Sequence, residues 1–311
     1  MILLEIALLA LGFVFLVKGA DWFVEGASGI ADKFGIPQLV IGLTIVAMGT
    51  SAPEAAVSIT AALRGNADIA VGNIVGSNIL NILIILGLSS VITSIAVAKT
   101  TIRYEIPIML GITFLLLYFG ANDGNIQLWE GIVLLACFVA YLLYMLVMVK
   151  SGQMQAEEIE DTKRPVWQLL IWGVVGLGLI IWGSDLTVDA ATALATRFGM
   201  SERFIGLTIV ALGTSLPELF TSVIAAKKGK ADIAIGNIVG SNIFNILFVL
   251  GISSLIIPVP FEAQFIVDCL VAVGAGVLLW VCVLSKKKLT RLHGIVMLLS
   301  YAAYFVYLLM K

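Results

Sequence analysis

Apolar residues occur along this chain in runs of about 20, separated by short polar stretches. A run of about 20 apolar residues is long enough to cross a lipid bilayer as an α-helix. The pattern predicts ten such helices, namely Ile2–Val24, Pro37–Leu63, Ile69–Ile92, Ile106–Gly120, Leu128–Val149, Val166–Val188, Phe204–Ala226, Ile233–Ile257, Phe265–Leu284 and Leu289–Met310. We therefore expect an all-α membrane protein.

The ten segments form two similar sets of five. With an offset of 164 positions and no gap, IGLTIVA at Ile41–Ala47 recurs at Ile205–Ala211, and GNIVGSN at Gly72–Asn78 recurs at Gly236–Asn242. The one long polar connection, residues 150–165, lies between the two sets. We expect one transport domain made of a five-helix repeat at residues 1–149, a cytoplasmic linker at 150–165 and a second repeat at 166–311.

The charges indicate how the repeats are inserted. Five is an odd number, so the second repeat must enter the membrane from the side opposite to the first. If the N-terminus faces outward, the cytoplasmic connections carry 13 Lys and Arg residues and the outer ones carry 4. Because positive charges favour the cytoplasmic side, both termini are predicted to be extracellular or periplasmic. Inverted repeats of this kind place a transporter's substrate site near the bilayer midplane, on interrupted helices.

Composition supports the membrane assignment and excludes other functions. The chain has 311 residues, of which 60% are hydrophobic and 12% charged, whereas soluble domains average about 45–50% and about 25%. No basic tract suggests binding to nucleic acid. The three cysteines lack the spacing of a metal site, and the single histidine, His293, follows a lysine run. We expect no cofactor.

One motif interrupts the apolar pattern in both repeats. Gly-Thr-Ser-Ala-Pro-Glu ends at Glu54, and Gly-Thr-Ser-Leu-Pro-Glu ends at Glu218. Proline lacks an N–H and clashes with the carbonyl four residues earlier, so Pro53 and Pro217 should break the second and seventh helices and release a carbonyl in each. Such carbonyls are tolerated in a membrane only where they face protein, water or a ligand. A carboxylate at that depth is by default a candidate functional group.

The residues around the two glutamates supply the oxygens that hard cations prefer. Ca²⁺ binds six to eight oxygens from carboxylates, hydroxyls, amides and backbone carbonyls. Thr50 and Thr214 each precede a glutamate by four positions, and so share its helix face. In the third and eighth helices, a polar stripe recurs at four-residue spacing. From that stripe we favour ligation by Ser77, Asn81, Ser241 and Asn245, and hydrogen bonds between helices for Asn73, Asn78, Asn237 and Asn242.

Two carboxylates that face one cavity indicate an exchange mechanism. Without a counter-charge they repel each other, and burial adds to the cost, so they should bind protons or cations. One divalent ion or two or more monovalent ions would neutralise them. An empty, doubly charged site should not cross the low-dielectric barrier, which favours obligatory exchange and alternating access.

The blocks GTSAPE…GNIVGSNILN and GTSLPE…GNIVGSNIFN resemble the two alpha repeats of the sodium/calcium exchanger family, in a prokaryotic-type member. The resemblance covers essentially all ten helices. It implies that Na⁺ and Ca²⁺ compete for one site on helices 2, 3, 7 and 8, and that helices 1 and 6 slide during transport. The implied ligands are Ala47 and Ala211 (through their carbonyls), Thr50, Ser51, Glu54, Ser77, Asn81, Thr214, Ser215, Glu218, Ser241 and Asn245.

The chain also departs from some members of the family. Potassium-dependent members and some archaeal ones resemble it except for an Asp where this chain has Asn245. The difference predicts K⁺-independent exchange with two negative charges at the site, which is electrogenic if more than two Na⁺ exchange for one Ca²⁺. We therefore expect a Na⁺/Ca²⁺ antiporter, not an enzyme, working as a monomer in the lipid bilayer of a prokaryotic plasma (inner) membrane.

Three alternative functions fit the sequence less well. The nearest alternative is an H⁺/Ca²⁺ antiporter. The glutamate motif of proton-coupled relatives resembles Gly-Asn-x-x-Glu, which this chain lacks at both glutamates. An intramembrane aspartyl hydrolase would use Asp21 and Asp185, neither of which lies in a Gly-x-Gly-Asp context. A passive channel is disfavoured by the paired carboxylates and the inverted repeat. No role is assigned to Asp268.

Overall fold

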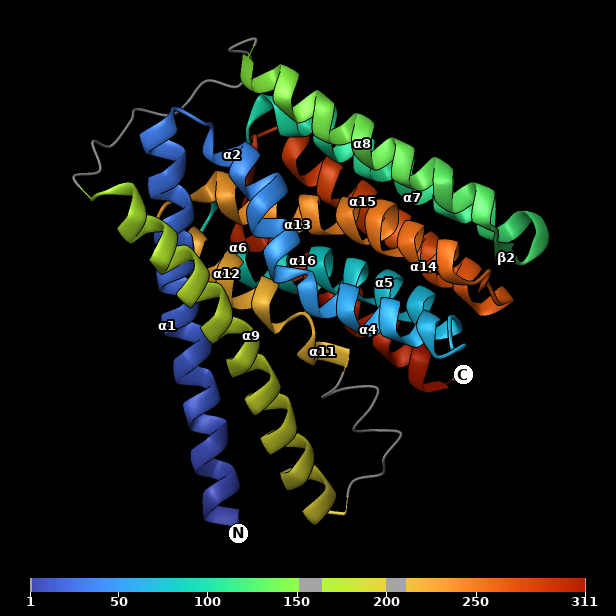
Figure 1. The fold of residues 1–311 in the computed structure, drawn as a ribbon, viewed down its shortest axis with the longest axis horizontal. Coiled ribbons are helices and arrows are strands. Elements are labelled where there is room, and N and C mark those ends of the chain that lie inside the picture. Colours follow the sequence, from blue (N-terminus) through green and yellow to red (C-terminus); the bar gives the residue numbers. More distant parts are fainter. Residues whose placement is uncertain (1, 151–163, 200–210, 311) are drawn as a thin grey trace.

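The computed structural model describes residues 2–150, 164–199 and 211–310, except for the side chains of Asp68 and Ala211. Within these residues, eight helices are long and apolar enough to cross a membrane. A ninth span results if Gln38–Thr50 and Ala52–Leu63, which meet at 49°, are counted together. The expected all-α membrane protein is confirmed (Figure 1). The predicted helix Phe204–Ala226 lies partly outside the described residues.

The first half of the chain contains five spans, several of them assembled from consecutive segments. Short π-helical turns, labelled η, lie inside three of these spans. In chain order the elements are α1 (Ile2–Phe34), α2 (Gln38–Ile41), η1 (Gly42–Val46), α3 (Ala47–Thr50), α4 (Ala52–Leu63), α5 (Asp68–Leu80), η2 (Asn81–Leu86), α6 (Gly87–Ile92), β1 (Ile95–Ala96), η3 (Thr101–Glu105), α7 (Ile106–Asp123), β2 (Asn125–Ile126) and α8 (Leu128–Lys150).

The second half repeats this order. Its described elements are α9 (Val166–Arg197), α11 (Ala211–Gly213), α12 (Leu216–Lys227), α13 (Ala231–Phe244), η5 (Asn245–Leu250), α14 (Gly251–Ile256), β3 (Val259–Pro260), α15 (Ala263–Leu284), β4 (Lys288–Leu289) and α16 (Arg291–Met310). Several starts are separated by 164 positions, as in the sequence repeat: α1 and α9, α4 and α12, η2 and η5, and β1 and β3. The repeat in sequence is therefore a repeat in structure.

The helices α1 and α9 are longer than the sequence indicated. They continue to Phe34 and Arg197, whereas the predicted spans ended at Val24 and Val188. In Figure 1 they lie side by side and extend beyond the other helices. They are antiparallel, as counterparts in an inverted repeat should be. Glycines on α1, spaced by seven residues, face glycines on α9 in reverse order: Gly12 faces Gly183, Gly19 faces Gly176 and Gly26 faces Gly173.

Ion pairs account for the extra length of α1. Lys228, just after α12, lies 2.8 Å from Asp21 and 3.1 Å from Glu25. Arg164 also pairs with Glu25 and stacks on the ring of Trp172, with the guanidinium 3.9 Å from the ring centroid. Asp21 therefore belongs to an ion-pair cluster in the middle of α1.

The fourth span also begins earlier than predicted, at Thr101 rather than Ile106. Its first turn contains Glu105, which is fully buried and accepts a hydrogen bond of 2.8 Å from Tyr144 of α8. Contacts from other helices hold this turn: Tyr144 bonds Glu105, and Trp280 Nε1 donates to the Ile102 carbonyl at 2.8 Å.

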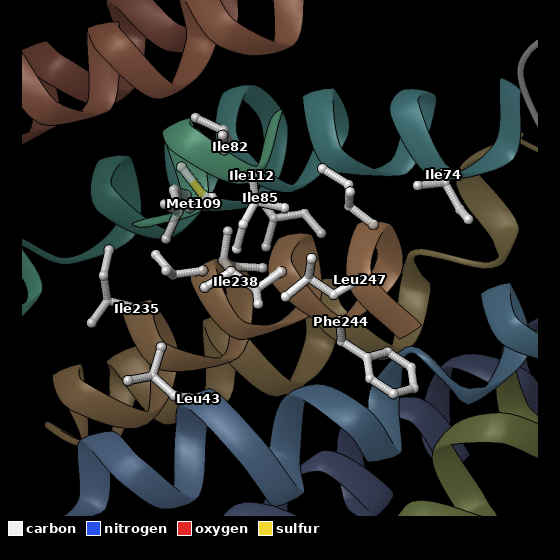
Figure 2. Close-up of a cluster of buried hydrophobic side chains, with 14 of the residues drawn as sticks. Leu43, Ile74, Ile82, Ile85, Met109, Ile112, Ile235, Ile238, Phe244 and Leu247 are labelled. Atoms are coloured by element: carbon white, nitrogen blue, oxygen red, sulfur yellow. The ribbon is translucent and has the colours of Figure 1, made fainter. Parts of the chain in front are cut away.

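The helix α13 lies at the centre of the protein. In the most apolar 18-residue stretch of its span, 94% is buried inside the protein. The corresponding share is 17% for α1 and 11% for α16. It packs against η1, α3 and α12. Figure 2 shows side chains from η1, α5, η2, α7, α13 and η5 meeting in this core, among them Leu43, Ile85, Met109 and Ile238. The segments that carry the polar motifs are thus held in the best-packed part of the fold.

Two short antiparallel strand pairs join the halves near their ends. In one pair Ile95 of β1 is opposite Leu289 of β4, and in the other Val259 of β3 is opposite Ile126 of β2. Since β1 and β3 are counterparts in the repeat, the two pairs are related to each other in the same way as the halves.

Candidate cation site

Both predicted helix breaks are present. The break in the first half falls at Ser51 (φ −82°, ψ 9°), and that in the second half at Ser215 (φ −88°, ψ 2°). Each proline then lies in the first turn of a new helix. Backbone N–H groups in that turn have no partner within the helix, so the missing N–H of proline costs no helical hydrogen bond. Glu54 and Glu218 are the third residues of α4 and α12. The helix dipole stabilises a negative charge in that turn.

One carbonyl released by a break has found a partner on another helix. The carbonyl of Gly213, four residues before Pro217, accepts a hydrogen bond of 2.6 Å from Ser184 Oγ of α9. This is the behaviour predicted for a carbonyl deprived of its helical partner, and it ties α9 to the break.

The two glutamates are held by serines from the opposite half. Ser51 Oγ donates to Glu218 Oε1 at 2.8 Å, and Ser215 Oγ donates to Glu54 Oε1 at 3.2 Å. Ser77 Oγ also lies 3.4 Å from Glu54 Oε1. Both glutamates are 1% exposed or less, and they are close enough for their charges to interact. The structure therefore brings the two predicted carboxylates into one buried site.

Four buried carboxylate and amide oxygens at this site have no hydrogen-bond partner among the described residues. They are the second carboxylate oxygens of the glutamates and the side-chain carbonyls of two asparagines, namely Oε2 of Glu54 and Glu218 and Oδ1 of Asn81 and Asn245. Buried polar atoms are nearly always satisfied. Four acceptors, two from each half and two of them charged, indicate a positively charged ligand.

The remaining predicted ligands lie around this cluster. Thr50 is fully buried and donates to Asn237 Oδ1 at 2.9 Å. The Ala47 carbonyl accepts the backbone N–H of Ser51 at 3.0 Å and faces Ser241 Oγ at 3.4 Å. Thr214 Oγ1 is buried and has no partner in the described part of the chain. For Ala211 the structure describes only the backbone, as the first residue of α11. Ligation by these residues stays a prediction.

The asparagines that we assigned to packing do bond between helices. Asn73 Nδ2 donates to the Glu54 carbonyl at 3.3 Å and to Ser58 Oγ at 2.9 Å. In the second half, Asn237 Nδ2 donates to the Glu218 carbonyl at 3.4 Å and to Ser222 Oγ at 3.0 Å. Sequence reasoning missed both supporting serines, although they too are separated by 164 positions.

A cavity of about 570 Å³ adjoins the site. Its lining comes from α4, α9 and the break before α12, and includes Pro53, Ser184, Asp185, Asp189 and Thr214. One predicted ligand, Thr214, and two carboxylates of α9 therefore line the same cavity. Among the described residues no group of three or more His, Cys, Asp or Glu could hold a metal ion.

The family profile of sodium/calcium exchanger proteins matches residues 4–147 and, a second time, residues 168–310. The chain belongs to the sodium/calcium exchanger family. It is similar to CaxA of Alkalimonas amylolytica, with 44% identity over 94% of this chain and 95% of the relative. It is also similar to the sodium/calcium exchanger MaX1 of Methanosarcina acetivorans, with 31% identity over 99% of both chains.

Solved structures of the sodium-calcium exchanger NCX_Mj have the same fold. The structure soaked with zero Na⁺ and Ca²⁺ aligns with a TM-score of 0.86 and 35% identity over 99% of this chain and 100% of that one. The structure soaked with 2.5 mM Na⁺ and 10 mM Sr²⁺ aligns with a TM-score of 0.85. The present chain is therefore a membrane cation/Ca²⁺ antiporter, and its family is one of transporters rather than enzymes.

Proposed function

We propose that this antiporter exchanges Na⁺ for Ca²⁺ by alternating access, electrogenically and without K⁺. The observation that carries the proposal is the set of four buried carboxylate and amide oxygens, two from each half, that have no partner among the described residues. The proposed ligands are the twelve residues predicted from the sequence: Ala47, Thr50, Ser51, Glu54, Ser77, Asn81, Ala211, Thr214, Ser215, Glu218, Ser241 and Asn245.

Charge balance supports obligatory exchange. Two buried carboxylates without compensation are costly, because removing charges from water is repaid only by well-placed counter-charges. One Ca²⁺ or two Na⁺ neutralises them, and a third Na⁺ would make a cycle electrogenic. The proposed ligands include no third carboxylate. Potassium-dependent members, which otherwise resemble this chain, carry Asp at the position of Asn245. A K⁺ ion is therefore not needed for neutrality.

Two halves of opposite orientation would supply the alternating access. We take residues 1–149 and 166–311 as five-helix repeats joined by a cytoplasmic linker at 150–165, with both termini outside the plasma (inner) membrane of a prokaryote. The double match to the family and the antiparallel α1 and α9 support this arrangement. The cavity beside α9 supports movement of α1 and α9 against the remaining helices. The monomer contains both halves of the site.

The test is a comparison of gradients in proteoliposomes that contain the purified protein. Vesicles loaded with Na⁺ and diluted into Na⁺-free buffer should accumulate radiolabelled Ca²⁺, and a pH gradient alone should not drive uptake. An inside-positive potential imposed by K⁺ and valinomycin should change the rate if exchange is electrogenic. Uptake driven only by the pH gradient would establish proton coupling instead.

Glutamine variants test the site itself. Glu54→Gln and Glu218→Gln should each abolish exchange, because each removes a charge that the cation neutralises. Glu130→Gln is a matched control, since Glu130 is also buried but only accepts the Gln127 N–H at 2.7 Å, which a glutamine can accept as well. Uptake at the wild-type rate by both site variants would remove the proposed site.

A further inference from the structure

Each predicted ligand asparagine is held by an asparagine from the opposite half of the chain. Asn81 Nδ2 donates to Asn242 Oδ1 at 2.9 Å, and Asn245 Nδ2 donates to Asn78 Oδ1 at 3.1 Å. All four side chains are 3% exposed or less. The amide nitrogen of each ligand is therefore engaged, and its oxygen is the atom without a described partner.

The two holding asparagines are fixed in turn by backbone. Asn78 Nδ2 donates to the Asn242 carbonyl at 3.1 Å, and Asn242 Nδ2 donates to the Asn78 carbonyl at 3.2 Å. Asn242 Nδ2 also lies 3.7 Å from Met109 Sδ. A backbone carbonyl can only accept, so the nitrogen of each holding amide must face it. The oxygen of that amide then faces the ligand asparagine.

This chain of hydrogen bonds has a fixed direction. An asparagine amide carries an acceptor oxygen and a donor NH₂ group, and rotation by a half turn about its last bond exchanges them. A cation binds the oxygen, whereas the NH₂ group would repel it. With the nitrogens of Asn81 and Asn245 directed at acceptors, their oxygens remain for the ion.

We propose that Asn78 and Asn242 are positioning residues that set the amide orientation of the two ligand asparagines. The inference rests on the proposed function, since it takes Asn81 and Asn245 as ligands. It assigns a role to the Asn-x-x-Asn spacing in both repeats: the first asparagine orients the ligand of the other half, and the second is the ligand. The π-helical turns η2 and η5 begin at the two ligand asparagines, Asn81 and Asn245. Such turns are often found at functional sites.

The pairing is specific, and this separates orientation from packing. Asn242 contacts the side chain of Asn81, while the Asn245 amide is held by Asn78. Loss of the Asn242 side chain should therefore act through Asn81 and not through Asn245. A general loosening of the helix packing would affect both ligands.

The experiment is a double-mutant cycle on Ca²⁺ binding to the purified full-length protein, measured by titration calorimetry in detergent. Asn242→Ala should weaken binding by about 10–100-fold, as loss of residues that orient a metal ligand commonly does. Combined with Asn81→Ala it should cost nothing beyond Asn81→Ala alone. Combined with Asn245→Ala the two losses should multiply. The mirror cycle with Asn78 should be coupled to Asn245 and independent of Asn81.

Losses that multiply in all combinations would assign Asn78 and Asn242 to packing and overturn the inference. Unfolding midpoints measured without Ca²⁺ identify variants that fail to fold. Should Asn242→Ala be one of these, Asn242→Asp keeps the acceptor oxygen, and orientation by that oxygen requires Ca²⁺ binding of at least one tenth of wild-type affinity. If the wild type binds no Ca²⁺, or Asn81→Ala and Asn245→Ala bind it normally, the proposed function or its ligand set fails as well. If Asn242→Ala and Asn78→Ala alone bind normally, only the present inference fails.

Discussion

Replacement of Gly176 by alanine tests the close contact between α1 and α9. A Cβ atom at Gly176 would lie 2.5 Å from the backbone nitrogen of Phe23 and 2.8 Å from the carbonyl oxygen of Gly19. Both atoms belong to the backbone of α1 and cannot rotate away. Gly178, two residues further along α9, has no atom within 4 Å of its Cβ position among the described residues, and provides the control.

The size of the effect follows from these distances. Ordinary contact begins near 3.4 Å, so a Cβ at 2.5 Å forces the helices apart by about 0.9 Å at this point. Overpacking of this kind costs about 1–3 kcal/mol, and in membranes helix association depends strongly on close packing of small residues. Alanine regains about 1 kcal/mol in helix propensity. We expect a net loss of up to about 2 kcal/mol for Gly176→Ala and a gain of up to about 1 kcal/mol for Gly178→Ala.

The measurement is the thermal unfolding midpoint of each purified variant in the same detergent, with Ca²⁺ uptake recorded in parallel. The expected order of midpoints is Gly178→Ala at or above the wild type, and Gly176→Ala below it. Equal midpoints for the two alanine variants would show that α1 and α9 do not touch at this glycine.

Two further predictions concern polar groups in the membrane. Ser215→Ala removes a hydrogen bond to the carboxylate of Glu54, and such a bond is worth about 1.5–3 kcal/mol. The Ca²⁺ concentration for half-maximal uptake should therefore rise about tenfold or more. The control is Ser253→Ala, which should leave this concentration unchanged because the Ser253 hydroxyl bonds within its own helix. Tyr144→Phe leaves the buried Glu105 without its donor, which should cost about 1–3 kcal/mol of stability, measured by thermal unfolding against the exposed control Tyr118→Phe.

Much of the site could be predicted because its chemistry is local and occurs twice. The motifs ending at Glu54 and Glu218 contain the helix breaker, the hydroxyls and the carboxylate within six residues, so their roles follow from spacing. The offset of 164 then indicated which residues correspond. The structure places these carboxylates together, which spacing alone could suggest but not show.

The parts that could not be predicted depend on contacts between distant segments. The α1 helix continues past Val24 because Glu25 is paired with Arg164 and Lys228, and no local pattern identifies those partners. The same holds for the early start of the fourth span, where Glu105 Oε1 accepts a hydrogen bond from Tyr144. The π-helical turns η2 and η5 leave no periodic signal in a uniformly apolar stretch.

The crossed hydrogen bonds of the site have a consequence for biosynthesis. Ser51 donates to a glutamate made 167 residues later, and Asn81 to an amide made 161 residues later. While the ribosome is still producing the second half, these groups in the first half have no permanent partners in the bilayer. The nascent chain is thus exposed to misfolding and to membrane quality control until α13 has been inserted, and a truncated product should be degraded rather than accumulate as half a transporter.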